Sequence, residues 1–63
     1  MEIYIVTEDM KYANGEEILF VGYQMKEAMN FAANLAAKRG AEPQGIYVRV
    51  WIEDECIATL HKS

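Results

Sequence analysis

Residues 24–39 have the period of an α-helix, and this segment limits the possible folds more than any other feature of the chain. Its apolar residues recur every three or four positions and gather on one side of a helix: Met25, Ala28, Met29, Phe31, Ala32, Leu35 and Ala36. Lys38 and Arg39 suit the negative end of the helix dipole. Gly40 suits the left-handed position just past the end, and Pro43 prevents the helix from resuming. A single helix with one apolar side can cover only one face of one small sheet.

Two segments with strand character precede this helix. Residues 2–7 are β-branched and aromatic, apolar on both faces and too short for a helix, so they predict an interior strand. Asn14-Gly15 favours the two positive φ angles of a type I′ turn, and residues 17–22 are expected to return beside the first strand. Strict alternation through the whole first strand would place charged residues on an apolar face. We therefore expect a bulge or an open loop near Glu8 and Asp9.

Two further strand segments follow the helix. Residues 44–52 alternate with a period of two, so their aliphatic side must face the helix. The acidic residues 53–55 then turn the chain into a last strand over residues 56–61. A three-residue loop predicts a consistent inner face in which Cys56 pairs with Ile52, Ala58 with Val50 and Leu60 with Val48.

The sequence therefore predicts a single α+β domain over residues 1–63. It is a ββαββ two-layer sandwich, with a four-stranded, mainly antiparallel sheet in the order 2-1-3-4 and one helix on one face. In this order every neighbouring pair of strands is antiparallel, whereas the alternative order 1-2-3-4 requires a parallel pair in a very small sheet. A domain of this size has a core worth only about 3–5 kcal/mol of net stability, so it needs economical packing or a partner.

Composition argues against several classes of function. Six Lys and Arg against ten Asp and Glu give a net charge of -4, which opposes direct nucleic-acid binding. One Cys excludes an internal disulfide, and one His with one Cys excludes a His/Cys zinc site within one chain. Cys56 and His61 would lie about 16 Å apart along one strand and on opposite faces, so they form no catalytic dyad. We therefore expect a protein that is not an enzyme, with no catalytic residue, bound metal or cofactor.

Acidic residues gather in the predicted turns, as Glu8-Asp9, Glu16-Glu17 and Glu53-Asp54-Glu55. They have three interpretations: solvated turns, an acidic surface offered to a basic partner, or a metal or catalytic site. The third requires the carboxylates to converge on one point. The tips of the two predicted hairpins project from opposite ends of the sheet, so convergence is not expected.

The sheet face away from the helix is the most informative part of the predicted fold. We expect it to carry Tyr4, Val6, Tyr47, Arg49, Trp51 and Ile57, with Leu19 or Phe20 according to the register. Tyr, Trp and Arg are enriched at the energetic centres of protein interfaces, and a contiguous apolar patch usually marks a contact. The expected partner-binding residues are Tyr4, Tyr47, Arg49, Trp51, Ile57, Glu53, Asp54 and Glu55. The alternatives are ordinary cross-strand packing left partly wet, or base stacking on RNA, which the negative charge disfavours.

The short acidic chain with two hairpins around one alanine-rich helix resembles the small phage-encoded proteins that inhibit host machinery. These include some anti-CRISPR proteins and the phage inhibitors of host RNA polymerase. The resemblance covers the whole chain in size and element order, and no functional residue carries over from it. It implies an anti-defence or host-takeover protein that acts by occupying a surface, with acidic groups standing in for nucleic-acid phosphates in some members.

The sequence thus favours a non-enzymatic protein-binding or inhibitor protein. We expect a homodimer and a protein partner, one that carries a basic nucleic-acid-binding surface, with no direct contact to nucleic acid or membrane. The alternatives are a small accessory or structural subunit of a larger assembly, and a dimer that sequesters a small ligand. Residues 1–7 carry an acid and no basic region before their apolar run, which is unlike a signal peptide. The expected location is the cytoplasm, of the host if the chain is phage-encoded.

Overall fold

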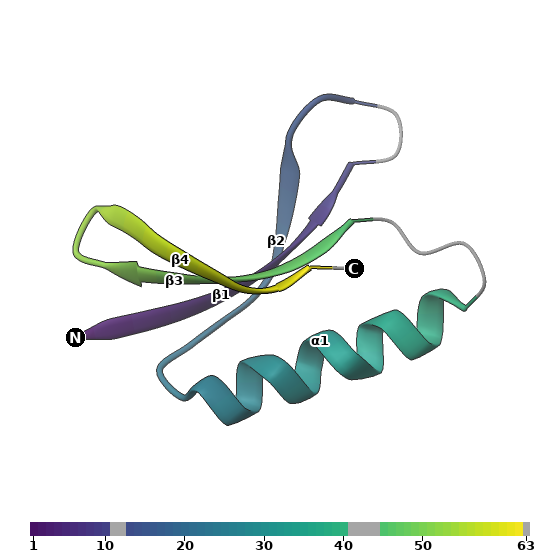
Figure 1. Ribbon diagram of the computed structural model, residues 1–63. Helices are drawn as coiled ribbons and strands as arrows, with labels where there is room; N and C mark the ends of the chain where they lie inside the picture. The colour runs from purple at the N-terminus through teal and green to yellow at the C-terminus, as the bar shows by residue number, and fades with distance from the viewer. Residues whose placement is uncertain (11–12, 41–44, 63) are drawn as a thin grey trace.

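Four strands pair in one sheet that the single helix covers from one side. The structure is a computed structural model that describes residues 1–10, 13–40 and 45–62. The elements in chain order are β1 (Glu2–Asp9), β2 (Glu16–Gly22), α1 (Met25–Arg39), β3 (Ile46–Ile52) and β4 (Glu55–Lys62). The sheet order is β2-β1-β3-β4 and every neighbouring pair is antiparallel (Figure 1). This confirms the predicted ββαββ fold and its strand order.

The helix begins and ends close to the predicted residues. Gln24 precedes it with an extended backbone and accepts a hydrogen bond from the backbone N–H of Ala28 at 3.2 Å. At the other end Gly40 has a φ of 71°, in the left-handed region, and donates its N–H to the carbonyl of Ala36 at 3.2 Å. This is the position at which glycine is favoured because it lacks a Cβ. Pro43, the other predicted stop signal, lies outside the described residues.

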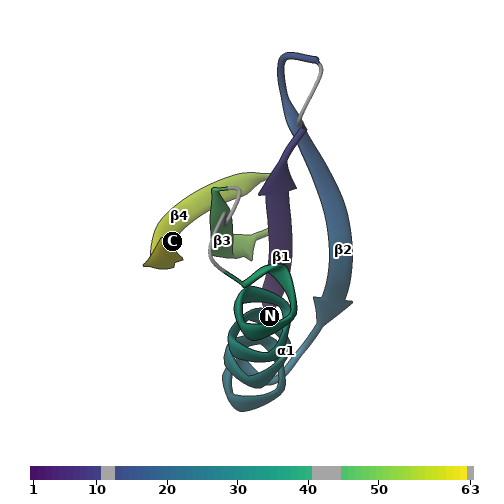
Figure 2. The same ribbon diagram turned by 90° about the vertical axis from the view of Figure 1, so that its right-hand side faces the viewer.

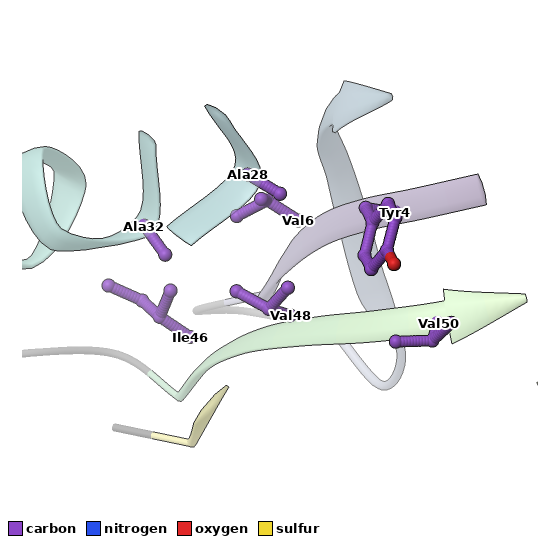
Figure 3. Close-up of a cluster of buried hydrophobic side chains, with 7 residues drawn as sticks. All are labelled: Tyr4, Val6, Ala28, Ala32, Ile46, Val48 and Val50. Atoms are coloured by element: carbon purple, nitrogen blue, oxygen red, sulfur yellow. The ribbon is translucent and has the colours of Figure 1, made fainter. Parts of the chain in front are cut away.

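The core lies between α1 and the middle of the sheet. Ala28 and Ala32 of the helix are completely buried, and the bulk opposite them comes from strand residues (Figure 3). The buried hydrophobic residues are Tyr4, Val6, Ala28, Ala32, Ile46, Val48 and Val50. Because alanine has no bulk beyond Cβ, α1 can lie directly on β1 and β3. Met25 was predicted on the buried side but is 52% exposed, since it precedes the first buried helical residue by almost one turn.

Tyr4 and Val6 lie on the face that the helix covers, so the prediction that they belong to the open face is wrong. In the β1–β3 ladder Tyr4 pairs with Val50 and Val6 with Val48, and directly paired residues point to the same face. The Tyr4 hydroxyl reaches the rim of the core and donates a hydrogen bond to Glu2 at 2.6 Å. That hydrogen bond raises the pKa of Tyr4 above its ordinary value.

The first hairpin differs from its predicted geometry in where its irregularity lies. β1 is paired through Asp9, and the bulge lies in β2 instead, where Leu19 is inserted between the partners of Val6 and Thr7. Gly15 has a positive φ and Asn14 does not, so the predicted type I′ turn is wrong. A hydrogen bond of 3.1 Å from the Met10 N–H to the Gly15 carbonyl closes a wider connection.

The bulge in β2 also decides the position of Phe20. Phe20 pairs with Val6 and therefore faces the helix, where its ring stacks on Phe31 with the ring centroids 5.0 Å apart. A Cβ at Gly22 would come within 2.9 Å of the Phe20 ring, so glycine makes room for this stack. Phe20 is thus not a residue of the open face.

The second hairpin has a two-residue turn in place of the predicted three-residue loop. Glu55 already belongs to β4 and pairs with Ile52, so Cys56 pairs with Trp51. Bulges follow at Ile57 and Leu60, which restores the predicted pairing of Ala58 with Val50 but places His61, and not Leu60, opposite Val48. From Glu55 to Leu60 every side chain of β4 is exposed, and α1 packs on β1, β2 and β3.

The turn between β3 and β4 contains a strained residue. Glu53 has a φ of 55°, a left-handed conformation that costs most L-residues about 1–2 kcal/mol and that asparagine adopts more readily. Glu53→Asn is therefore expected to raise the free energy of unfolding by about 0.5–1 kcal/mol, measured by urea denaturation. Asp54→Asn removes the same charge at a residue without positive φ, and it should change stability much less. Equal effects of the two substitutions would assign the gain to charge and contradict the strain.

Candidate protein-binding face

The face of the sheet opposite α1 is uncovered in the part of the chain that the structure describes (Figure 2). We call it the open face. The strand ladders place on it Ile3, Ile5 and Thr7 of β1, Glu16, Ile18 and Val21 of β2, Tyr47, Arg49 and Trp51 of β3, and Cys56 and Thr59 of β4. Tyr47, Arg49 and Trp51 therefore lie where the strict alternation of β3 predicts them. The open face has two chemically different halves.

The polar half is held together by Arg49. Its guanidinium donates to both carboxylate oxygens of Glu16, at 2.6 and 3.1 Å, and to the Thr59 hydroxyl at 2.9 Å. Its carbon also lies 4.6 Å from the centre of the Tyr47 ring, which is a cation–π contact. Glu16 accepts a further hydrogen bond of 2.6 Å from Thr7, so all four strands contribute to one network. Arg49 thus connects neighbouring strands of the sheet, and its charge is already paired with Glu16.

The charges of this network follow from its hydrogen bonds. Arg49 and the Thr7 hydroxyl hold the pKa of Glu16 below its ordinary value. The Tyr47 hydroxyl donates to Asp9 at 3.1 Å, and this hydrogen bond raises the pKa of Tyr47. At neutral pH the polar half therefore holds the Arg49–Glu16 ion pair and a neutral Tyr47.

The apolar half lies toward the β3–β4 turn. Trp51 pairs there with Ile3 on one side and Cys56 on the other, while Ile5 pairs with Val21. Val21 of β2 is 57% exposed, whereas Ile3, Ile5 and Trp51 are partly buried. Ile3, Ile5 and Val21 were not predicted as site residues, because their face depends on the pairing of β1 and not on its own sequence pattern.

Acidic residues border the apolar half. Glu53, Asp54 and Glu55 are all exposed at the β3–β4 turn, which follows Trp51 after one residue. Ile57, predicted as part of the same site, is 51% exposed but is the inserted residue of a bulge in β4. The β3–β4 turn and the connection between β1 and β2 lie at opposite ends of the sheet, as predicted (Figure 1). Within the described residues, no three His, Cys, Asp or Glu side chains are placed to hold a metal ion.

Glu8 was predicted in an acidic turn together with Asp9, and this prediction is wrong because both belong to β1. Glu8 points toward the helix, is only 5% exposed, and accepts two hydrogen bonds of 2.7 Å from Arg39 at the end of α1. The Arg39 guanidinium holds the pKa of Glu8 below its ordinary value, although burial acts in the opposite direction. The pair connects the end of the helix to β1 on the face opposite the candidate site.

The side of α1 toward β2 carries an open hollow. Its lining residues are Phe31, Asn34, Leu35 and Lys38. Phe31 forms both the wall of the hollow and the stack with Phe20, so the hollow adjoins β2. It is an open surface depression and does not enclose a ligand.

Comparison with protein-family models, with curated proteins and with solved structures finds no significant match for this chain. None of the helices in the described ranges is long and apolar enough to cross a membrane. The geometry of the site itself is therefore the basis for a functional proposal.

Proposed function

We propose that this chain is a non-enzymatic protein-binding protein whose apolar half of the open face contacts a protein partner. The observation that carries the proposal is the row of Ile3, Ile5 and Trp51 on a face that α1 leaves uncovered. Contiguous apolar surface of this kind is unusual on a monomer without a partner, and tryptophan is the residue most enriched at interface centres.

The chemistry of the open face favours protein over nucleic acid or a small ligand. Arg49, the cation among the open-face residues with described side chains, is bound to Glu16 and so does not offer a free charge to phosphate. Nucleic-acid binding needs several unpaired cations, and the chain has a net charge of -4. An open apolar strip with a polar border is the usual anatomy of a protein interface.

The acidic turn specifies the character of the partner. Glu53, Asp54 and Glu55 would lie beside the contact and attract a surface rich in Lys and Arg. A nucleic-acid-binding surface with an apolar patch has this character, and a protein that occupies it acts as an inhibitor. The resemblance to small phage proteins in size and element order supports an anti-defence or host-takeover role in the host cytoplasm. A partner bound away from any nucleic-acid site would instead favour the accessory-subunit alternative.

The experiment is to capture the partner with the intact chain and measure its binding kinetics across a salt series. Trp51→Ala is expected to raise the dissociation rate at least about tenfold, because a buried aromatic anchor holds a formed complex. Neutralising Glu53, Asp54 and Glu55 together should instead lower the association rate, most strongly at low salt.

Glu27→Gln is the control, since it removes an acid from the exposed surface of α1. It should change neither rate by more than about twofold. Circular dichroism of each variant verifies that the fold is intact. If a captured partner binds Trp51→Ala as tightly as the wild type, the open face is not the contact surface.

A further inference from the structure

The two edges of the sheet are not equally protected against pairing with another strand. β2 and β4 are the edge strands. β4 carries two bulges, at Ile57 and Leu60, and bulges interrupt the regular ladder that an added strand requires. β2 carries one bulge, at Leu19, and contains neither lysine nor proline. Its Ile18 and Val21 are 61% and 57% exposed. β2 is therefore the less protected edge and the more apolar one.

The bulge gives β2 an unusual symmetry. Ile18 and Val21 are three residues apart and would point to opposite faces of a regular strand. Because Leu19 is inserted, Ile18 pairs with Thr7 and Val21 with Ile5, so both lie on the open face. Two copies of β2 arranged antiparallel about the Leu19–Phe20 bond would then place Ile18 of each chain opposite Val21 of the other. Opposed residues of an antiparallel pair must share a face, and these do.

The positions that flank these two pairs are also compatible. Within one chain Glu17 pairs with Glu8 and Gly22 with Tyr4, so both lie on the helix face. In the dimer, Glu17 of one copy would lie opposite Gly22 of the other. Glu16 would face the exposed Tyr23, so no carboxylate meets another carboxylate.

β4 fails the same test. Bringing its exposed Ile57 opposite Leu60 of a second copy also places Ala58 opposite Thr59. Ala58 pairs with Val50 on the helix face and Thr59 with Arg49 on the open face, so these two residues point to different faces.

From these observations we infer that two copies of the chain pair through β2, forming one continuous antiparallel sheet with both helices on the same face. The hollow on α1 adjoins β2 and would face the second helix across the new ladder. Contact between the two helices would add buried area to the dimer. The addition is needed because stable interfaces bury about 800 Å² per partner and one seven-residue edge strand supplies only part of that area. The dimer uses Ile18 and Val21 at the β2 edge of the open face and leaves Ile3, Ile5 and Trp51 free, so the inference does not depend on the proposed partner.

The test measures the oligomeric state of the full chain by sedimentation equilibrium from about 10 μM to 1 mM. The wild type should show a monomer–dimer equilibrium. Ile18→Lys and Val21→Lys should each raise the dissociation constant at least about tenfold, because a lysine would replace one member of each of the two central apolar pairs. Ile57→Lys makes the same change at a similarly exposed residue of the other edge, and it should leave the equilibrium unchanged.

A double variant tests the register itself. Ile18→Lys combined with Val21→Glu places opposite charges across the two symmetric contacts, so the dimer should return, although Ile18→Lys and Val21→Glu should each weaken it alone. A wild type that is monomeric at about 1 mM overturns the inference, as does a dimer that survives Ile18→Lys. Loss of the dimer in Trp51→Ala would move the contact to the open face. Binding of the captured partner is measured separately, so failure of one proposal does not affect the other.

Discussion

Ala32→Leu is expected to lower the free energy of unfolding by about 3 kcal/mol, most of the stability available to a domain of this size. Ala32 is completely buried between α1 and the sheet, where Val6, Ile46 and Val48 are also completely buried. Three additional carbon atoms have no space at this contact, so the helix must move away from the sheet or the strands must separate. Urea denaturation followed by circular dichroism at 222 nm measures the loss.

Ala33→Leu is the matched control. Ala33 is the next residue of the same helix and is exposed, so the substitution adds the same volume with the same helix propensity but without a packing partner. Its effect should stay within about 0.5 kcal/mol. If both variants unfold at the wild-type urea concentration, the close packing of α1 on the sheet is contradicted.

The order of the elements and of the strands could be predicted because each segment carries its own period and ends at its own signal. The helix over residues 24–39 ends at Gly40, and β3 alternates strictly around Tyr47, Arg49 and Trp51. These patterns are local, so they survive without knowledge of any tertiary contact. For the same reason the residues of β3 on the open face were predicted correctly.

The face of β1 could not be predicted in this way. Its residues are apolar on both faces, so alternation separates Ile3 and Ile5 from Tyr4 and Val6 without saying which pair is covered by the helix. Pairing with the helix-facing side of β3 decides the question, and that contact joins residues far apart in the sequence. The apolar half of the candidate site was therefore only partly predicted.

The register in which neighbouring strands pair also could not be predicted from the sequence. A bulge changes the face of every later residue in a strand, and the bulges at Leu19, Ile57 and Leu60 have no distinctive residue such as glycine to mark them. The two arginine–glutamate pairs are likewise long-range contacts. Arg49 and Arg39 are 33 and 31 residues from their partners, so no spacing rule identifies them.

Arg39→Met is expected to destabilise the protein by about 2 kcal/mol at pH 7. It should also reverse the sign of the contribution that Glu8 makes to the pH dependence of stability. The substitution leaves the Glu8 carboxylate, only 5% exposed, without its two hydrogen bonds from Arg39. Glu17 pairs with Glu8 on the same face and adds a second negative charge nearby. The expected loss is below that of a fully buried pair because the Arg39 side chain is 37% exposed.

The direction of the pH effect follows from the pKa of Glu8. In the wild type this pKa is lowered by Arg39, so the pair stabilises the fold above the unfolded-state pKa of about 4.3. That stabilisation disappears as the pH falls through the lower folded-state value. In Arg39→Met the burial that raises the pKa of Glu8 is no longer opposed by Arg39, so we expect this pKa to lie above the unfolded-state value. The variant is therefore penalised at neutral pH and relieved of the penalty as the pH falls toward 4.

Urea denaturation between pH 3 and pH 7 should thus show two stability curves that are well separated at pH 7 and converge in acid. Lys38→Met removes an adjacent exposed cation from the same helix end, and its curve should run parallel to the wild type with a small offset. Glu8→Gln removes the titrating group, so the curves of Glu8→Gln and of Glu8→Gln combined with Arg39→Met should not show this convergence. Glu16 also has a lowered pKa, but Arg49 is present in every variant, so its contribution cancels in the comparison. Parallel curves for the wild type and Arg39→Met would show that Glu8 is hydrated in the folded protein and that Arg39 does not neutralise a buried charge.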